Sequence, residues 1–315
     1  MNKNTIEFGI LILGFNRPEL LDRTLSALVN TSDLKDSVGF FSLDGPRSGT
    51  DVEAVKQCQE VFSKYQGSFK ETLNLFTDSN LGLRNKVMQS VTQAFERVEN
   101  LIVLEDDCVV GATTIDFFRF GFSWLQGQPE GVISGNYLGK AQQEKAFLAK
   151  RFSSWGWGTN ASTWNRFRLH PFSQRPLVEL KSEIRNHTWV DPLPYQYEYK
   201  QMNRRLGELN SWAIPFDMFL RSEGIKTLKP TRNQIQNIGF GSESTHTSRG
   251  LSLSIPTQKL DIENLVVADE KISSRIEKQE AWTKFSLLAK ELIFSRNLHS
   301  PISRASSFSG SKRSD

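Results

Sequence analysis

The fold is decided by the stretch Phe8-Gly9-Ile10-Leu11-Ile12-Leu13-Gly14-Phe15-Asn16-Arg17-Pro18. Its first eight residues are almost continuously apolar, as in a strand of a parallel sheet that is covered on both faces. Asn16 then offers a helix N-cap, and Pro18 suits the first turn of a helix. Apolar side chains continue at helical spacing at Leu20, Leu21, Leu25 and Leu28. The stretch therefore predicts a strand, a tight turn and a helix.

The same strand-and-helix unit recurs over the first hundred residues. Further strands are predicted at Val38–Leu43, Thr72–Phe76 and Leu101–Leu104, with helices from Asp51, carrying Val52, Val55 and Phe62 toward the core, and over Arg84–Val98. Such alternation predicts an α/β fold with a mainly parallel sheet and flanking helices. Ligands of these sheets bind beyond the carboxyl ends of the strands. We therefore expect one crevice to collect the polar residues that follow the strands, which are Asn16, Arg17, Asp44, Glu105, Asp106 and Asp107.

The pattern changes after Trp124. Strand and helix alternate less clearly, and Gly, Trp and Tyr become frequent, which suits a smaller subdomain packed on the first. A helix is predicted over Lys271–Leu292, with Ile276, Trp282, Phe285, Leu288 and Leu292 on its apolar side. From Ser295 onward the Ser- and Arg-rich composition is typical of a disordered tail.

Composition and charge narrow the function classes. The chain has 315 residues, 38% of them hydrophobic, and a net charge of +4. No basic helix or aromatic-basic repeat appears, so we expect no nucleic acid partner. Cys58 and Cys108, the only cysteines, lack metal-site spacing and favour a reducing compartment. The sequence shows no signal-peptide pattern and no run of the roughly 18 to 20 apolar residues that a membrane span needs. We therefore expect a cytoplasmic protein without a transmembrane segment. Such a protein can still contact a membrane through a partner.

The acidic triplet Glu105-Asp106-Asp107 follows a strand that is expected to be buried. Carboxylates in such a place are costly unless something positive meets them, and a divalent cation does so. Mg2+ and Mn2+ take one or two carboxylates together with phosphate oxygens, so they suit a site for a nucleotide diphosphate. The alternative is that one Asp caps a helix beginning near Thr113 and the others are solvated.

The other candidates each have two interpretations. Asp44 is followed by Gly and Pro, so it either forms a turn or accepts a hydrogen bond from a base or ribose. Arg17 either pairs with phosphate or packs beside a helix start. The segment Trp155-Gly156-Trp157-Gly158 either approaches and stacks on a sugar or fills the core. His246, judged from spacing alone, is more typical of an ordinary hydrogen-bonded histidine than of a ligand.

Taken in order, several motifs resemble one family. They are Gly14-Phe15-Asn16-Arg17-Pro18, Leu43-Asp44-Gly45, Asn80-Leu81-Gly82-Leu83, Leu104-Glu105-Asp106-Asp107, Ser154-Trp155-Gly156-Trp157, Ser211-Trp212 and Asn237-Ile238-Gly239-Phe240-Gly241 with Thr245-His246. Over residues 8 to 250 this order resembles bacterial GT-A glycosyltransferases, which are similar to the eukaryotic N-acetylglucosaminyltransferase I family. The resemblance implies a GT-A type α/β fold with residues 1–125 binding the nucleotide sugar and 126–250 on the acceptor side, a C-terminal extension over 251–294 and a disordered tail over 295–315.

The resemblance also implies roles for single residues. Asp44 reads the nucleotide base, Asp106 lies near the ribose, and Asp107 binds Mn2+ or Mg2+ directly. The loop Trp155-Gly156-Trp157-Gly158 walls the donor and acceptor sugars. His246 matches a late histidine that meets the metal or the diphosphate in many GT-A enzymes.

One position departs from the family. The family's carboxylates after the tryptophan equivalent to Trp212 are replaced here by Ala213 and Ile214. Asp217 is the nearest candidate for the general base that deprotonates the acceptor, with Glu243 and Glu198 as rivals. An inverting outcome is an expectation of the resemblance alone.

These observations predict a metal-dependent glycosyltransferase. It would move a hexosyl or N-acetylhexosaminyl unit from a nucleotide-diphosphate sugar, with UDP expected, to a glycan or other hydroxyl acceptor in bacterial cell-envelope or exopolysaccharide synthesis. A sugar nucleotidyltransferase is one alternative, but Gly14-Phe15-Asn16-Arg17-Pro18 is a poor version of its Gly-rich, basic loop. A non-catalytic sugar-nucleotide or glycan-binding protein is the other.

Overall fold

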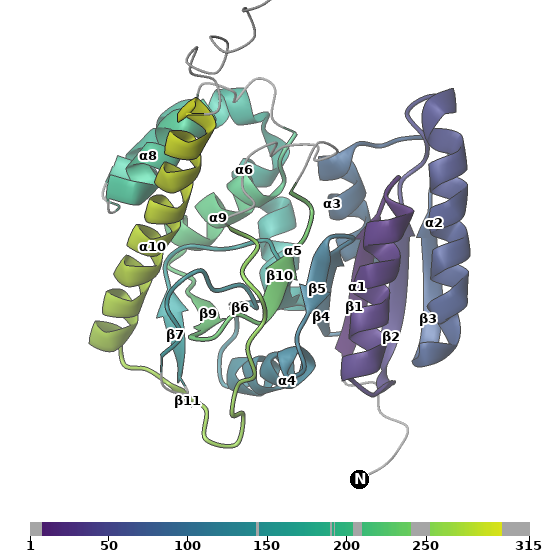
Figure 1. Ribbon diagram of the computed structural model, residues 1–315, viewed down its shortest axis with the longest axis horizontal. Helices are drawn as coiled ribbons and strands as arrows, with labels where there is room; N and C mark the ends of the chain where they lie inside the picture. Colours follow the sequence, from purple (N-terminus) through teal and green to yellow (C-terminus); the bar gives the residue numbers. More distant parts are fainter. Residues whose placement is uncertain are drawn as a thin grey trace, which may run out of the picture.

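The computed structural model describes residues 8–142, 145–189, 191, 193–203, 210–240 and 253–297. A single nine-stranded sheet runs through the molecule in the order β11-β7-β9-β6-β8-β4-β1-β2-β3 (Figure 1). Its strands are β1 (Phe8–Gly14), β2 (Leu34–Leu43), β3 (Phe69–Phe76), β4 (Asn100–Glu105), β6 (Val132–Ser134), β7 (Lys145–Ala149), β8 (Trp157–Asn160), β9 (Thr227–Pro230) and β11 (Val266–Val267). A separate two-stranded sheet pairs β5 (Cys108–Val110) with β10 (Ile235–Asn237).

The first four strands form a parallel block in which β1 lies between β2 and β4. Leu13 of β1 is paired with Glu105 of β4, and Gly14 is paired with Leu43 of β2. These three strands therefore end at the same edge of the sheet. Strand β8 then runs antiparallel to β4 and joins the parallel block to the second half of the sheet.

Alternate residues of β1 enter two different cores, as the pleat of a strand requires. Ile10 and Ile12 pack with apolar side chains of the helices on one face, and Leu11 and Leu13 with those on the other. The first face carries α1 (Pro18–Thr31), α2 (Val52–Tyr65) and α4 (Thr114–Leu125), and the second carries α3 (Leu83–Ala94), α5 (Ala161–Leu169) and α9 (Ala213–Ser222). This double coverage explains the continuous apolar run of β1.

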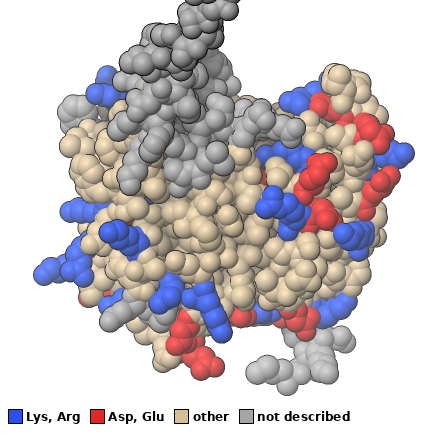
Figure 2. Space-filling view, in the orientation of Figure 1, with Lys and Arg blue, Asp and Glu red and all other residues tan. Residues whose placement is uncertain are grey.

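The second half adds α6 (Pro171–Gln174), α7 (Lys181–Trp189), α8 (Leu193–Asn203) and α10 (Glu270–Asn297). Helix α10 packs against β7 and α8 on the far side from α2 (Figure 1). On the face drawn in Figure 2, acidic and basic side chains are interspersed around α1 and α2, while the middle is largely uncharged. No helix among the described segments is both long enough and apolar enough to cross a bilayer.

The predicted α/β class, with a mainly parallel sheet and flanking helices, is confirmed. The two predicted halves share this one sheet, and the division at 125/126 remains a prediction. Two predicted core residues are wrong, because Val52 is 53% exposed and Trp282 is 49% exposed. Helix α10 extends to Asn297, so the first residues of the predicted tail are helical, and residues 298–315 lie outside the described part.

Phe62 of α2 provides a test of the first core. It is completely buried, and its ring stacks on Phe41 of β2 with centroids 4.6 Å apart. We expect Phe62→Ala to lower the free energy of unfolding by about 3–5 kcal/mol, since the truncation leaves a cavity. Val52→Ala on the same helix is the matched control and is expected to change it by less than about 0.5 kcal/mol. Equal effects in urea denaturation would contradict this packing.

Candidate active site

A pocket of about 170 Å³ opens where β1, β2 and β4 end. It brings together residues that are far apart in the sequence but were all predicted to meet, namely Asn16, Arg17, Asp44, Glu105 and Asp106. Convergence follows from the strand pairing, because parallel neighbours present their carboxyl ends at one edge.

Arg17 is the basic side chain in direct contact with the acidic triplet. Its Nε donates to Asp106 Oδ2 over 3.1 Å, another of its nitrogens pairs with Asp106 Oδ1, and Nη1 donates to Asp107 Oδ2 over 3.2 Å. Thr24 of α1 donates to the carbonyl of Asp106 over 2.8 Å, which ties the middle of α1 to the residue that follows β4. Arg17 is thus a partner of the carboxylates and not merely packed beside a helix start.

Three carboxyl groups lie close to this single guanidinium. Burial and the charges of Asp107 and Asp106 raise the pKa of Glu105 to about 8. Burial also raises the pKa of Asp106 to about 7, although Arg17 opposes the rise. Burial lowers the pKa of Arg17, but the two aspartates outweigh this and hold it above its usual value. Burial therefore disfavours the ionised forms of Glu105 and Asp106, and a bound cation is one way to offset that cost.

Asp107, the last residue of the triplet, is held by the end of β10 and by the residues that follow it. Its Oδ1 accepts from Asn237 Nδ2 over 3.1 Å, and its carbonyl accepts from Ile238 N over 2.9 Å. Gly239 lies so close that a Cβ there would overlap the Asp107 carboxylate. The Asn-Ile-Gly sequence noted in the chain is therefore the segment that packs on Asp107.

The donor chemistry at Asp107 fits a divalent cation of the Mg2+ or Mn2+ kind. Across the described residues, no three His, Cys, Asp or Glu side chains form a ligand set. Cations that accompany a diphosphate need only one or two protein carboxylates, because phosphate and water oxygens complete the shell. Asp107, 7% exposed and one of three adjacent carboxyl groups, can supply such a ligand.

Asp44 has a structural task at the pocket wall. Its carboxylate accepts hydrogen bonds from the backbone N–H groups of Leu81 and Gly82, over 2.9 and 3.0 Å, and from the hydroxyl of Thr77. Gly82 is the N-cap residue just before α3 and has a φ of 77°, a conformation that favours glycine. Asp44 therefore fixes the loop that leads into α3, in line with its interpretation as a turn former, while still lining the pocket.

Two basic residues that line the pocket were missed by the sequence interpretation, Arg47 and Lys86. Arg47 binds Asp51, whose carboxylate also accepts from Asn16 Nδ2 over 2.8 Å. Lys86 is 4% exposed and donates to the carbonyl of Leu75 over 2.6 Å. The sequence offered an indication that Lys86 is buried, because it lies on the same side of its helix as Val87 and Val91.

The alternating Trp-Gly loop separates into a pocket part and a core part. Trp155 is partly buried, and its ring contacts that of Phe240 with centroids 5.5 Å apart. Gly156 has a φ of 62°, and a Cβ there would lie 2.5 Å from Ile235 of β10. Trp157 is completely buried and stacks on Trp212, so it occupies the core and has no access to a sugar.

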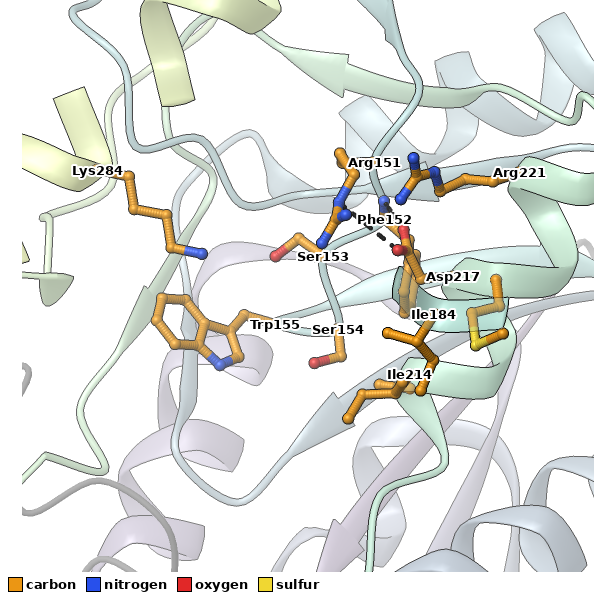
Figure 3. Close-up of a pocket in the computed structure, with 12 residues that line it drawn as sticks. Arg151, Phe152, Ser153, Ser154, Trp155, Ile184, Ile214, Asp217, Arg221 and Lys284 are labelled. Atoms are coloured by element: carbon orange, nitrogen blue, oxygen red, sulfur yellow. Dashed lines mark hydrogen bonds and ion pairs between the residues drawn. The ribbon is translucent and has the colours of Figure 1, made fainter. Parts of the chain in front are cut away.

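Asp217 lies on α9 at a second pocket of about 270 Å³, which Trp155 also lines (Figure 3). Its Oδ1 accepts from Phe152 N over 2.8 Å, and its Oδ2 lies 3.6 Å from Arg151 Nε. Of the rival bases, Glu243 lies outside the described residues, and the side chain of Glu198 is not described. His246, the predicted metal ligand, also lies outside the described residues.

Comparison with known proteins finds no matching family model and no matching curated protein. Among solved structures the chain is similar to the mannosyltransferase PcManGT from Pyrobaculum calidifontis in complex with GDP-Man and Mn2+, at 8% identity and a TM-score of 0.40, covering 70% of this chain and 75% of that one. It is also similar to the galactosyltransferase LgtC in complex with donor and acceptor sugar analogues, at 9% identity and a TM-score of 0.35, covering 70% and 72%.

A third similar structure is a putative glucose-1-phosphate thymidylyltransferase from Bacillus anthracis, at 10% identity and a TM-score of 0.38, covering 82% of this chain and 100% of that one. All three TM-scores are below 0.5, so the function has to be argued from the residues of the site.

Lys86 gives a pH test of the pocket. Burial lowers its pKa to about 8, from 10.5, although Asp44 opposes the shift. The unfolded chain therefore binds more protons than the folded one between these pH values, and the free energy of unfolding should rise with pH across that window. We expect a gain of up to roughly 3 kcal/mol, absent in Lys86→Met. Urea denaturation at pH 7.5 and 10 measures this gain. An equal change in the free energy of unfolding for the wild type and for Lys86→Met would contradict the burial of a charged amine.

Proposed function

We propose that this chain is a glycosyltransferase that uses a nucleotide-diphosphate sugar as its donor. The observation that carries the proposal is the pocket at the ends of β1, β2 and β4, where the carboxyl groups of Glu105 and Asp106 lie beside the basic side chains of Arg17, Arg47 and Lys86. A diphosphate that arrives with a divalent cation supplies both charges that such a site needs.

Residues of this pocket and of the segments around it are assigned roles in donor binding. Asp107, with His246, would hold Mn2+ or Mg2+, whose positive charge stabilises the leaving diphosphate. Arg17 and Lys86 provide donors for phosphate oxygens. Asp106 is assigned to the ribose, and Asp44, through the loop that it fixes, to the base. Trp155 and Gly156 wall the sugar.

The transfer itself is a substitution at the anomeric carbon of the donor sugar. The acceptor hydroxyl oxygen forms a bond to that carbon, and the bond from the carbon to the diphosphate oxygen breaks. The electron pair leaves with the nucleoside diphosphate, and the acceptor proton passes to a general base. We assign the base to Asp217, which lines the pocket next to Trp155, and expect inversion at the anomeric carbon.

The cellular setting is part of the same proposal. We assign a UDP-sugar donor, a hexosyl or N-acetylhexosaminyl unit, and a glycan acceptor of the bacterial cell envelope or an exopolysaccharide. Cys58 and Cys108 are buried free thiols, which suits the reducing conditions of the cytoplasm.

The donor site is tested by thermal unfolding with UDP-, GDP-, dTDP- and CMP-sugars, each with and without Mn2+. At a hundredfold excess over its dissociation constant, the correct donor should add about 2.7 kcal/mol to the free energy of unfolding. We expect this gain to require the metal and to disappear in Asp107→Ala, while Asp116→Ala, an exposed position on α4, keeps it. Stabilisation that survives in Asp107→Ala would refute the metal assignment.

Asp217→Asn tests the base separately from the donor. We expect turnover to fall by about 10²–10⁴-fold, because proton transfer is lost, while donor affinity stays within about twofold. Ser222→Ala, on an exposed turn of the same helix, is expected to keep wild-type turnover. Normal turnover of Asp217→Asn would show that the general base is another residue. Donor binding by the wild type without transfer to any hydroxyl acceptor would favour the binding-protein alternative.

A further inference from the structure

Strand β7 is paired with another strand along only part of one edge. It pairs with β9 on one side, while on the other side β11 is paired with Lys145 and Ala146 alone. Backbone N–H groups beyond that point need other acceptors, because a buried N–H group without a partner is costly. Helix α10 supplies the first acceptor, since the Ser273 hydroxyl accepts from Leu148 N over 3.2 Å. The helix thus takes the place of a neighbouring strand at this edge.

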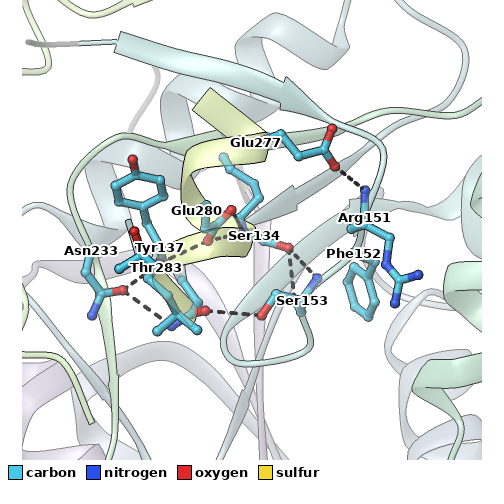
Figure 4. A network of polar contacts seen from close by, with 12 residues as sticks. Ser134, Tyr137, Arg151, Phe152, Ser153, Asn233, Glu277, Glu280 and Thr283 are labelled. Atoms are coloured by element: carbon cyan, nitrogen blue, oxygen red, sulfur yellow. Dashed lines mark hydrogen bonds and ion pairs between the residues drawn. The ribbon is translucent and has the colours of Figure 1, made fainter. Parts of the chain in front are cut away.

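Glu277 of α10 continues this role beyond the end of β7. Its Oε1 accepts from the backbone N–H groups of Lys150 and Arg151, over 2.8 and 3.1 Å (Figure 4). Glu277 is 8% exposed, and a carboxylate in such a place is costly unless it is hydrogen-bonded. Burial raises its pKa, and the two N–H groups oppose the rise. A buried side chain that lies 127 residues after Lys150 therefore fixes the backbone of this segment.

The next N–H group of the segment belongs to Phe152, and Asp217 of α9 accepts from it. This bond to Asp217 Oδ1 is 2.8 Å long, and Asp217 Oδ2 lies 3.6 Å from Arg151 Nε (Figure 3). Both oxygens of the proposed general base therefore contact Arg151 and Phe152. Glu277 binds the backbone of the first of these residues, which adjoins the second. The orientation of the Asp217 carboxylate thus depends on where Glu277 holds the segment.

The segment stays fixed as far as the loop that carries Trp155. Ser153 N donates to Ser134 Oγ over 3.3 Å, and this hydroxyl donates to the Ser153 carbonyl over 2.8 Å (Figure 4). The four consecutive N–H groups of residues 150–153 are thus bound by side chains of α10, α9 and β6. Trp155 follows shortly after and lines the same pocket as Asp217. A backbone held at each residue presents both side chains in one arrangement, as catalysis requires of its groups.

We propose that Glu277 is a positioning residue of the acceptor side, which sets the orientation of the Asp217 carboxylate through the backbone of residues 150–152. The inference rests on the proposed function, in which Asp217 is the general base, and adds to it the residue that holds this base in place. Helix α10, in the C-terminal extension, is thereby a support of the active site as well as a cover for the edge of β7.

Amide hydrogen exchange of the full chain, followed residue by residue by NMR, tests this coupling without any substrate. Glu277→Met removes the acceptor and leaves a side chain of similar volume. We expect the amides of Lys150, Arg151 and also Phe152 to exchange about tenfold or more faster, since hydrogen bonds to a charged group are lost. The Phe152 amide is decisive, because its own acceptor, Asp217, is unchanged in this variant.

Two further variants separate positioning from a general loss of packing. Ser273→Ala removes another hydrogen bond between α10 and β7, so it should speed exchange at Leu148 while Phe152 keeps its wild-type rate. Glu277→Gln retains an oxygen that can accept from both N–H groups. A neutral acceptor is weaker, so the amides of residues 150–152 should exchange faster together, by less than in Glu277→Met. This comparison decides the matter even if Glu277→Met does not fold.

The catalytic consequence is measured as nucleotide released from the stabilising nucleotide sugar, with methyl glycosides as acceptors. We expect kcat to fall about 10–100-fold in Glu277→Met, because a misplaced base loses its geometry toward the acceptor. The KM of the donor should stay within about twofold, since the donor pocket lies at other strand ends. Glu277→Gln should recover most of the wild-type kcat, and Ser273→Ala should keep it.

Three results would overturn the proposal: a Phe152 amide that keeps its wild-type exchange rate while those of Lys150 and Arg151 rise, an equal loss of kcat in Ser273→Ala and Glu277→Met, or no recovery of kcat in Glu277→Gln. Failure of the proposed function is distinguishable, because the exchange experiment needs no substrate. If nucleotide sugars neither stabilise the wild type nor react with it, the proposed function is wrong, and the exchange rates still decide whether Glu277 positions Asp217.

Discussion

Three carboxyl groups follow one another at the end of β4, and the guanidinium of Arg17 meets two of them. The pairing of β1 with β4 brings the two segments together, because Leu13 lies opposite Glu105. Around this ion pair, α1 is tied to the carbonyl of Asp106, and the segment after β10 closes on Asp107. Three carboxyl groups thus lie beside one guanidinium, and the proposal of a cation and a diphosphate at this end of the sheet rests on that arrangement.

The part of the fold that could be predicted from the sequence is the part governed by local periodicity. Strands β1 to β4 and their helices follow from apolar runs that alternate with helical spacing, and the ligand edge follows from parallel pairing. Strands such as β6 and β10 have only three residues each and find partners far along the chain, as β10 does with β5, so no local pattern marks them. The helix predicted over Arg84–Val98 ends at Ala94, and the one predicted over Lys271–Leu292 extends to Asn297.

Within the site, residue types could be predicted but their surroundings could not. Trp155 and Trp157 look alike in the sequence, yet one contacts Phe240 beside a pocket and the other is completely buried. Asp44 was open to two interpretations, a turn former or a ligand of the base or ribose, and only the structure shows that its carboxylate accepts from the loop before α3. Lys284 lies about 130 residues after Trp155 in the chain, and only the docking of α10 shows that they share a pocket. Tertiary packing decides each of these cases.

The central claim, that the acidic triplet receives a cation together with a diphosphate, is tested most directly by anomalous X-ray diffraction from crystals grown with Mn2+ and the stabilising nucleotide. The account predicts a manganese peak within coordination distance of the Asp107 carboxylate, with the nucleotide in the pocket between Asp44 and Arg17. A nucleotide bound in that pocket without manganese at Asp107, or a nucleotide bound elsewhere on the chain, would contradict it.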